Sequence, residues 1–151
     1  DPDFVIILRC DALLVHGLDE ALARGRAYVA AGADVLFIES PRTMQEIETI
    51  ARSFAVPLLY NMGASGKTPF LSAAELKRIG GWKIMILPNF ATLAAIKAMR
   101  EVLAEIRATG TAATVRDRCA TFEDLMDLAG LPEVQAMERR YGLPEEAYTR
   151  M

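Results

Sequence analysis

The sequence predicts an α/β protein built from four consecutive strand–helix units. Four short apolar segments have the length and composition of buried strands, and each is followed by a loop and then by helical periodicity. Hydrophobic residues make up 52% of the chain and aromatic residues only 7%, which favours an aliphatic core over a β-sandwich. Units of this kind form either a doubly wound sheet or part of a (βα)8 barrel. Because a whole barrel needs about 250 residues, the 151 residues predict half a barrel.

The first two predicted strands each end at a charged side chain. The run 4–8 is continuously apolar, which is typical of a strand covered on both faces, and Arg9 follows it. A helix that opens near Asp19 leads to a second apolar run at 35–38, which ends at Glu39.

The rest of the chain continues the alternation. Two helix starts carry a serine or threonine followed three positions later by glutamate, the pattern of a capping box, at Thr43–Glu46 and Ser72–Glu75. The remaining expected elements are a helix ending near 54, a strand at 56–60 followed by Asn61, a short helix ending near 79, a strand at 83–87 and a helix from about 91 to 108.

The chain changes character after residue 109. We therefore divide it into a half barrel at 1–109 and a C-terminal helical extension at 110–151, with helices starting near Thr121 and at 133–141. The extension has no strand partner and carries apolar side chains. Packing on a partner subunit and folding back onto the same barrel both account for this pattern.

Charge and composition exclude several classes of function. The net charge is −3 and there is no long basic run, so neither nucleic acid nor an anionic membrane surface is expected as a partner. No apolar run reaches the roughly 18 residues of a membrane-spanning helix, and no signal peptide precedes the first strand, so we expect a cytoplasmic protein. With one histidine and two distant cysteines, an internal Cys/His zinc site is implausible.

Arg9, Glu39 and Asn61 are the candidate site residues. Parallel strands of an α/β protein deliver functional groups at their carboxyl ends, and all three residues stand at such ends. We therefore expect them to face one ligand. Asp11 is a candidate ion-pair partner of Arg9 and, alternatively, a cap for its own loop. The Gly66-Lys-Thr68 sequence is not a P-loop, because the glycine required five positions earlier is Asn61.

Several motifs of residues 1–141 resemble the C-terminal half of the isocitrate lyase / phosphoenolpyruvate mutase superfamily. They include the first strand ending in Arg9-Cys-Asp-Ala12, the segment Ala31-Gly-Ala-Asp-Val-Leu-Phe-Ile-Glu39, and Pro57-Leu-Leu-Tyr-Asn-Met62 with Gly66-Lys-Thr-Pro69. The closer similarity is to its short members, of the methylisocitrate lyase, 2,3-dimethylmalate lyase and oxaloacetate decarboxylase kinds.

The resemblance implies a (βα)8 barrel that binds a small 2-oxo or 2-hydroxy dicarboxylate beside Mg²⁺. It implies a carbon–carbon lyase or decarboxylase that stabilises an enolate, and a homo-oligomer, either a dimer or a tetramer. By position, Arg9 and Asn61 resemble the residues that bind the substrate carboxylate, with the backbone of Met62 and Gly63 beside them. Glu39 resembles the acid in the outer shell of the metal, reached through water.

Departures from the family pattern suggest other possibilities. Nothing in the chain matches the family's metal-binding aspartates or its K-[KR]-C-G-H loop, so we expect a fragment without the first half of the barrel, inactive alone. Gly63 and Ala64 replace a hydroxyl and a carboxylate residue, and Leu93 replaces a common arginine. These changes point to a smaller dianion such as oxaloacetate, or to a non-catalytic paralogue that only binds carboxylates. A doubly wound binding module complete at 151 residues is the third possibility.

Overall fold

A computed structural model describes residue 1 and residues 3–142 of the chain. Its elements are β1 (Ile7–Cys10), α1 (Ala12–His16), α2 (Leu18–Ala30), β2 (Val35–Ile38), α3 (Met44–Ser53), β3 (Leu58–Asn61), α4 (Ala73–Ile79), β4 (Trp82–Ile86), α5 (Phe90–Thr109), a 3₁₀ turn η1 (Arg116–Arg118), α6 (Phe122–Leu128) and α7 (Leu131–Tyr141). A first compact unit covers Asp1–Ala95 and a second begins at Ile96, within α5. The division of the chain into a half barrel at 1–109 and a helical extension at 110–151 stays a prediction.

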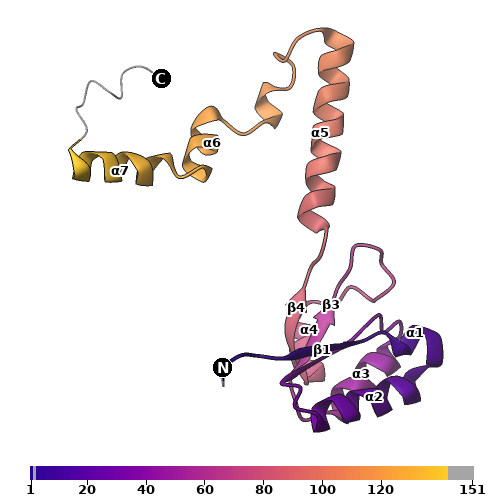
Figure 1. Ribbon diagram of the computed structural model, residues 1–151. Coiled ribbons are helices and arrows are strands. Elements are labelled where there is room, and N and C mark those ends of the chain that lie inside the picture. The colour runs from indigo at the N-terminus through magenta and orange to yellow at the C-terminus, as the bar shows by residue number, and fades with distance from the viewer. Residues whose placement is uncertain (2, 143–151) are drawn as a thin grey trace. The chain divides into compact units, whose positions relative to one another are not determined.

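The first unit is a parallel four-stranded sheet in the order β1-β2-β3-β4 (Figure 1). Side chains alternate between the two faces of a strand. One face packs on the helices through a core that includes Leu36, Leu58 and Tyr60 from the strands and Leu22 and Ile50 from α2 and α3. The opposite face carries a separate apolar cluster of Val35, Phe37 and Leu59, with Ile86 packed against it. The sheet is therefore apolar on both faces, as parallel sheets are.

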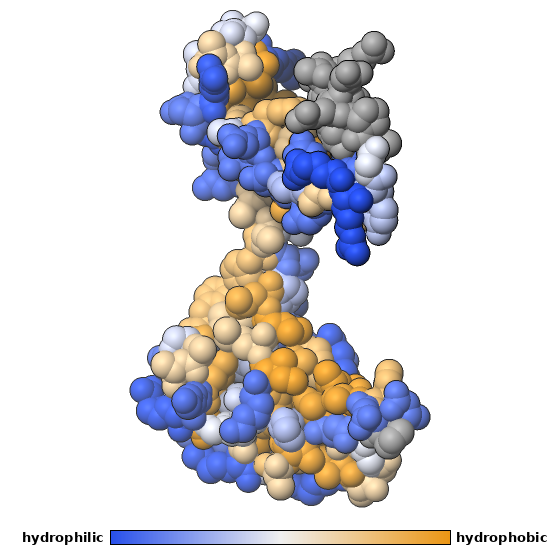
Figure 2. Space-filling model, turned by 90° about the vertical axis from the view of Figure 1, so that its left-hand side faces the viewer, coloured by the Kyte–Doolittle hydropathy of each residue, from blue (hydrophilic) through white to orange (hydrophobic). Residues whose placement is uncertain are grey.

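The expectation that 4–8 forms a strand covered on both faces is wrong. The strand begins only at Ile7 and includes Arg9, and side chains 4–7 are exposed, from 72% at Phe4 to 44% at Ile7. The physical reason is position: β1 is an edge of the described sheet, whereas all four side chains of the internal strand β2 are buried. Figure 2 shows in orange that much of the surface of this unit is apolar on the face in view.

A β-bulge changes the direction of side chains along β4. Leu58 pairs with Trp82 and the next residue, Leu59, pairs with Ile84, so Lys83 is the extra residue of the bulge. An extra residue reverses the alternation, so Trp82 packs into the core under the helices while Ile86 reaches the opposite face. The bulge thus places Trp82 and Ile86 on opposite faces, although residues four apart in a regular strand share a face.

Both predicted capping boxes are confirmed. Thr43 accepts a hydrogen bond from the Glu46 amide at 3.1 Å while the Glu46 carboxylate accepts one from the Thr43 amide, and Ser72 and Glu75 repeat this at α4. Local chemistry over four residues specifies these helix starts, so sequence alone finds them.

We expect Thr43→Ala to lower the free energy of unfolding by about 1 kcal/mol, because an orphan amide of the first turn of α3 loses its acceptor. Equilibrium urea unfolding measures the change. Thr43→Ser keeps the hydroxyl and serves as the control. Equal losses in the two variants would contradict a capping role.

The second unit contains most of α5 and the helices after it. An ion pair between Arg118 and Glu105 at 2.6 Å ties η1 to α5, and Val115 beside it is buried. Thr121 and Asp124 form a capping box at the start of α6, where the sequence predicted a helix. Within the described part of the chain, no helix combines the length and apolarity that crossing a bilayer requires.

Candidate functional site

The structure brings Arg9, Glu39 and Asn61 together. They stand at or just after the carboxyl ends of β1, β2 and β3, which are neighbours in the sheet. Arg9 pairs in register with Phe37, and its guanidinium lies 4.9 Å from the centre of that ring. By the alternation of side chains, all three residues lie on the face of the Val35–Phe37–Leu59 cluster, away from the helices. Their individual roles stay a prediction.

Glu39 is the centre of a polar cluster that it forms with Arg9 and Asn61. Its side chain is only 14% exposed. Asn61 Nδ2 donates to both carboxylate oxygens, at 3.4 Å to Oε1 and 3.2 Å to Oε2, and Arg9 Nη2 lies 3.4 Å from Oε2. A nearly buried carboxylate requires such donors, since burying a polar group without hydrogen bonds is energetically costly. Glu39 is thus held by groups from two neighbouring strands.

Arg9 also forms an ion pair with Asp11. Arg9 Nε donates to Asp11 Oδ2 at 2.9 Å and Nη2 donates to Oδ1 at 2.8 Å, a bidentate arrangement. Asp11 precedes α1 but its side chain makes no capping hydrogen bond there. Of the two interpretations of Asp11, the structure therefore supports the ion pair. Sequence reasoning missed α1 itself, which occupies part of the expected loop.

The Arg9–Asp11 pair makes stability depend on acid pH. The hydrogen bond from Arg9 lowers the pKa of Asp11 below its ordinary 3.8. A carboxyl whose pKa falls on folding stabilises the protein above its unfolded pKa and loses that contribution as pH falls through the folded pKa. We therefore expect the free energy of unfolding to fall more between pH 5 and pH 3 in the parent chain than in Asp11→Asn.

Denaturant unfolding at several pH values checks this expectation. The difference between the chains should be small, because both side chains are at least half exposed to solvent, and it should shrink further in high salt. Parallel pH profiles of the two chains at low salt would contradict it.

The loop after β3 is connected to the strand by a hydrogen bond from the phenol of Tyr60. Tyr60 Oη donates to the Pro69 carbonyl at 2.8 Å, and burial raises the pKa of Tyr60 to about 12, so the group stays a donor at ordinary pH. Met62 donates its amide to the Ile86 carbonyl at 3.0 Å and buries its side chain in the helix-side core. Gly63 follows it in the loop. That their backbone contacts a ligand stays a prediction, and for Met62 the amide is already engaged within the sheet.

The described residues supply only part of a magnesium site. No cluster of three or more His, Cys, Asp or Glu side chains placed to hold a metal occurs in the described part of the chain. Mg²⁺ takes six oxygen ligands and usually keeps several waters. Asn61 Oδ1 is buried and has no protein hydrogen-bond partner. These groups are compatible with the predicted outer-shell contact of Glu39 through water, and they do not form an inner ligand set alone.

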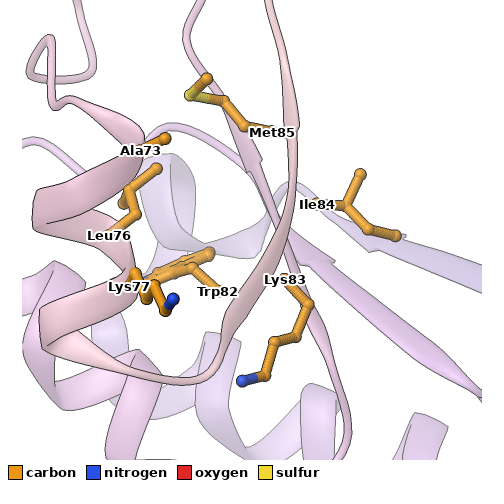
Figure 3. A pocket seen from close by; sticks show the side chains of 7 residues that line it. All are labelled: Ala73, Leu76, Lys77, Trp82, Lys83, Ile84 and Met85. Carbon is orange, nitrogen blue, oxygen red and sulfur yellow. The ribbon is translucent and has the colours of Figure 1, made fainter.

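A separate hollow of about 300 Å³ lies elsewhere, between α4 and β4 (Figure 3). Its lining is mainly apolar: Ala73, Leu76, Lys77, Trp82, Lys83, Ile84 and Met85. Figure 3 shows Trp82 and Leu76 on one side of the β4 ribbon and Ile84 on the other, as the bulge requires. Because none of the clustered polar residues lines it, this hollow is not the candidate site.

Sequence reasoning missed one residue of the cluster, Ser40. It is buried, with 6% of its surface exposed, and its hydroxyl donates to Glu39 Oε1 at 2.7 Å. Its backbone has φ 57°, in the left-handed region. The pattern gives no signal of this, because left-handed positions usually carry glycine or asparagine rather than serine.

Comparison with known proteins gives concordant results. Residues 1–107 match the phosphoenolpyruvate phosphomutase family. The chain is 40% identical to 2,3-dimethylmalate lyase of Eubacterium barkeri over 141 residues, which are 93% of this chain and 48% of that protein.

Solved structures with small carboxylates bound are among the matches. An oxaloacetate acetylhydrolase in complex with the inhibitor 3,3-difluorooxalacetate matches with a TM-score of 0.86 and 32% identity, over 95% of this chain and 48% of that one. A phosphonopyruvate hydrolase in complex with oxalate and Mg²⁺ matches with a TM-score of 0.82 and 34% identity, over 93% and 50%.

The chain thus spans about half the length of the relatives it matches. Its four parallel strands alternating with helices correspond to half of a family TIM barrel, followed by C-terminal helices, as the sequence predicted. A match over most of the sequence and a match of the fold lead to the same assignment. The chain belongs to the phosphoenolpyruvate mutase / isocitrate lyase superfamily of carbon–carbon lyases and hydrolases.

Proposed function

We propose that this chain supplies the carboxylate-binding part of a Mg²⁺-dependent carbon–carbon lyase or decarboxylase. The substrate would be a small 2-oxo or 2-hydroxy dicarboxylate cleaved through an enolate. The observation that carries the proposal is the convergence of Arg9, Glu39 and Asn61 at neighbouring strand ends. The relatives support this ligand class, because one has a structure with the inhibitor 3,3-difluorooxalacetate bound and another has a structure with oxalate and Mg²⁺ bound.

The residues have chemically distinct tasks in this proposal. Arg9 carries a fixed positive charge and a planar set of donors suited to a carboxylate. Nη1 of Arg9 makes none of the contacts to Asp11 and Glu39, so this edge of the guanidinium is the one offered to the ligand. Glu39 holds the Asn61 amide group and would accept a hydrogen bond from a metal-bound water. The metal, when bound, would stabilise negative charge that develops on the enolate oxygen.

Turnover would require groups from outside these 151 residues. The cluster contains a cation, a nearly buried carboxylate and an amide, and the carboxylate is already engaged by donors. A lyase also needs metal ligands and an acid or base placed at the bond that breaks. We therefore expect the chain alone to bind a dicarboxylate without cleaving it.

Titration calorimetry with oxalate and Mg²⁺ tests binding by the chain. Joining the chain to the first half of 2,3-dimethylmalate lyase tests turnover, measured as pyruvate released from oxaloacetate, with enzyme-free Mg²⁺ solutions as the control for spontaneous decarboxylation. Binding by the chain and turnover by the chimera are the expected results. Absence of oxalate binding in both proteins would overturn the proposal.

The second candidate function is a non-catalytic, carboxylate-binding paralogue. Gly63 and Ala64 favour it, because they lack the hydroxyl and the carboxylate that the family pattern has in the loop after β3. Oxalate binding without turnover by the chimera, across a panel of oxaloacetate and methyl-substituted malates, would support this alternative over the lyase.

We further propose that the protein is a cytoplasmic homo-oligomer, a dimer or tetramer, with the helical extension packing on a second copy. Helix α6 of the extension contains no buried residue, and Phe122, Leu125 and Leu128 are all exposed. Apolar residues at this spacing form a stripe along one side of a helix. Size-exclusion chromatography with light scattering should give more than one copy for the whole chain and one copy for a version ending at Thr109.

A further inference from the structure

Ser40 combines burial, a left-handed backbone and contact with the central carboxylate. Only it and Asn89 among the described non-glycine residues have positive φ, 57° and 69°. Side chains other than glycine adopt this conformation at an energetic cost, which persists only where the surroundings enforce it. Ser40 also precedes Pro41, and a residue before proline prefers an extended backbone. Two local preferences are therefore overridden at one residue.

The backbone conformation accounts for the contact that Ser40 makes. Successive side chains of an extended strand point to opposite faces, so residue 40 in a continued strand would point away from residue 39. The left-handed turn directly after β2 breaks this alternation. It brings the Ser40 hydroxyl to 2.7 Å from Oε1 of Glu39, although the two residues are adjacent in sequence.

This hydroxyl makes the shortest contact of the Glu39 carboxylate. The contacts from Asn61 and Arg9 lie between 3.2 and 3.4 Å. An ionised carboxylate only accepts hydrogen bonds, and without Ser40 its Oε1 would keep a single donor at 3.4 Å. The carboxylate would then be held mainly through Oε2, by Asn61 Nδ2 at 3.2 Å and Arg9 Nη2 at 3.4 Å, and its orientation toward the Asn61 amide would be less fixed.

We propose that Ser40 is a positioning residue, whose strained backbone is retained so that its hydroxyl fixes the Glu39 carboxylate between Arg9 and Asn61. This inference deepens the proposed function and rests on it, because the purpose of a fixed Glu39 is to present the cluster to a carboxylate ligand. Ser40 itself acts through Glu39.

Two substitutions separate the hydroxyl from the backbone. Ser40→Ala removes the hydroxyl and keeps the side chain that makes φ 57° unfavourable, whereas Ser40→Gly removes both. If the hydroxyl positions Glu39, both variants should weaken oxalate binding in the presence of Mg²⁺ by about fivefold, as for loss of one ordinary hydrogen bond, because Ser40 acts on the ligand only through Glu39. Ser40→Gly should nevertheless melt at a higher temperature than Ser40→Ala.

The side-chain amide of Asn61 provides a readout that does not depend on binding. Its two Nδ2 protons, assigned with Asn61→Ala, should shift in both Ser40 variants in ¹H–¹⁵N spectra, because the carboxylate that accepts from them moves. An unshifted Asn61 amide in both variants, or oxalate affinity within twofold of the parent chain, would overturn the inference. If neither the parent chain nor the chimera binds oxalate, the proposed function fails while the Asn61 spectrum still decides the role of Ser40.

Discussion

Arg9→Met should weaken oxalate binding by roughly 30- to 150-fold, equivalent to about 2–3 kcal/mol, the upper part of the range for hydrogen bonds to a charged partner. Methionine retains the apolar contact over Phe37 but removes the cation beside Glu39. The ligand would lose its main positive partner, and the nearly buried carboxylate would keep only neutral donors. Titration calorimetry in the presence of Mg²⁺ measures the change.

Arg24→Met is the matched control for this prediction. Arg24 pairs with Glu20 at 2.7 Å on the surface of α2, and its exposure, 44%, is close to the 50% of Arg9. Exposed helix pairs of this kind contribute little to stability, so the control should bind oxalate within about twofold of the parent chain. Similar losses in the two variants, or unchanged binding in Arg9→Met, would show that Arg9 does not bind the ligand.

Gly81→Ala, directly before β4, should lower the free energy of unfolding by about 2–4 kcal/mol. Gly81 has φ +73°, and an added Cβ would lie 2.8 Å from the Ala51 carbonyl oxygen and 3.2 Å from the Ala51 Cα. Backbone atoms of α3 cannot move aside as a flexible side chain can. The Gly81 carbonyl also accepts the Leu58 amide at 3.0 Å, so the strain would act where β3 meets β4.

The neighbouring glycine separates conformational strain from collision. Gly80 has φ +85°, and a Cβ there would meet no atom within 4 Å. Gly80→Ala should therefore cost about 1–3 kcal/mol, the strain of a backbone at φ 85° and ψ 172°, a region essentially confined to glycine, with no collision added. Urea unfolding of both variants measures the difference, and equal losses would show that α3 yields to the added methyl group.

Features determined within a few residues could be predicted from the sequence. The capping boxes at Thr43 and Ser72 depend on groups three positions apart, and both form as expected. The meeting of Arg9, Glu39 and Asn61 also follows from the sequence, because parallel strands in sequential order align their carboxyl ends.

Features determined by what surrounds a residue could not be predicted in this way. The run 4–8 has the composition of a covered strand, but its exposure depends on the absence of a neighbour beyond β1 in the described sheet. The left-handed conformation of Ser40 opposes the preferences of a serine and of a residue before proline, and the sequence does not show the contact with the Glu39 carboxylate that accompanies it.

The two outer strands of the sheet differ in their resistance to unwanted pairing between molecules. β4 carries a bulge with Lys83 as its extra residue, and bulges and lysines are the features with which natural edge strands oppose pairing with other chains. The run from Phe4 to Leu8 has no charge and no bulge. In a concentrated solution of this chain, association should therefore occur first through the β1 edge. Val5→Lys should raise the highest concentration at which the protein stays in solution.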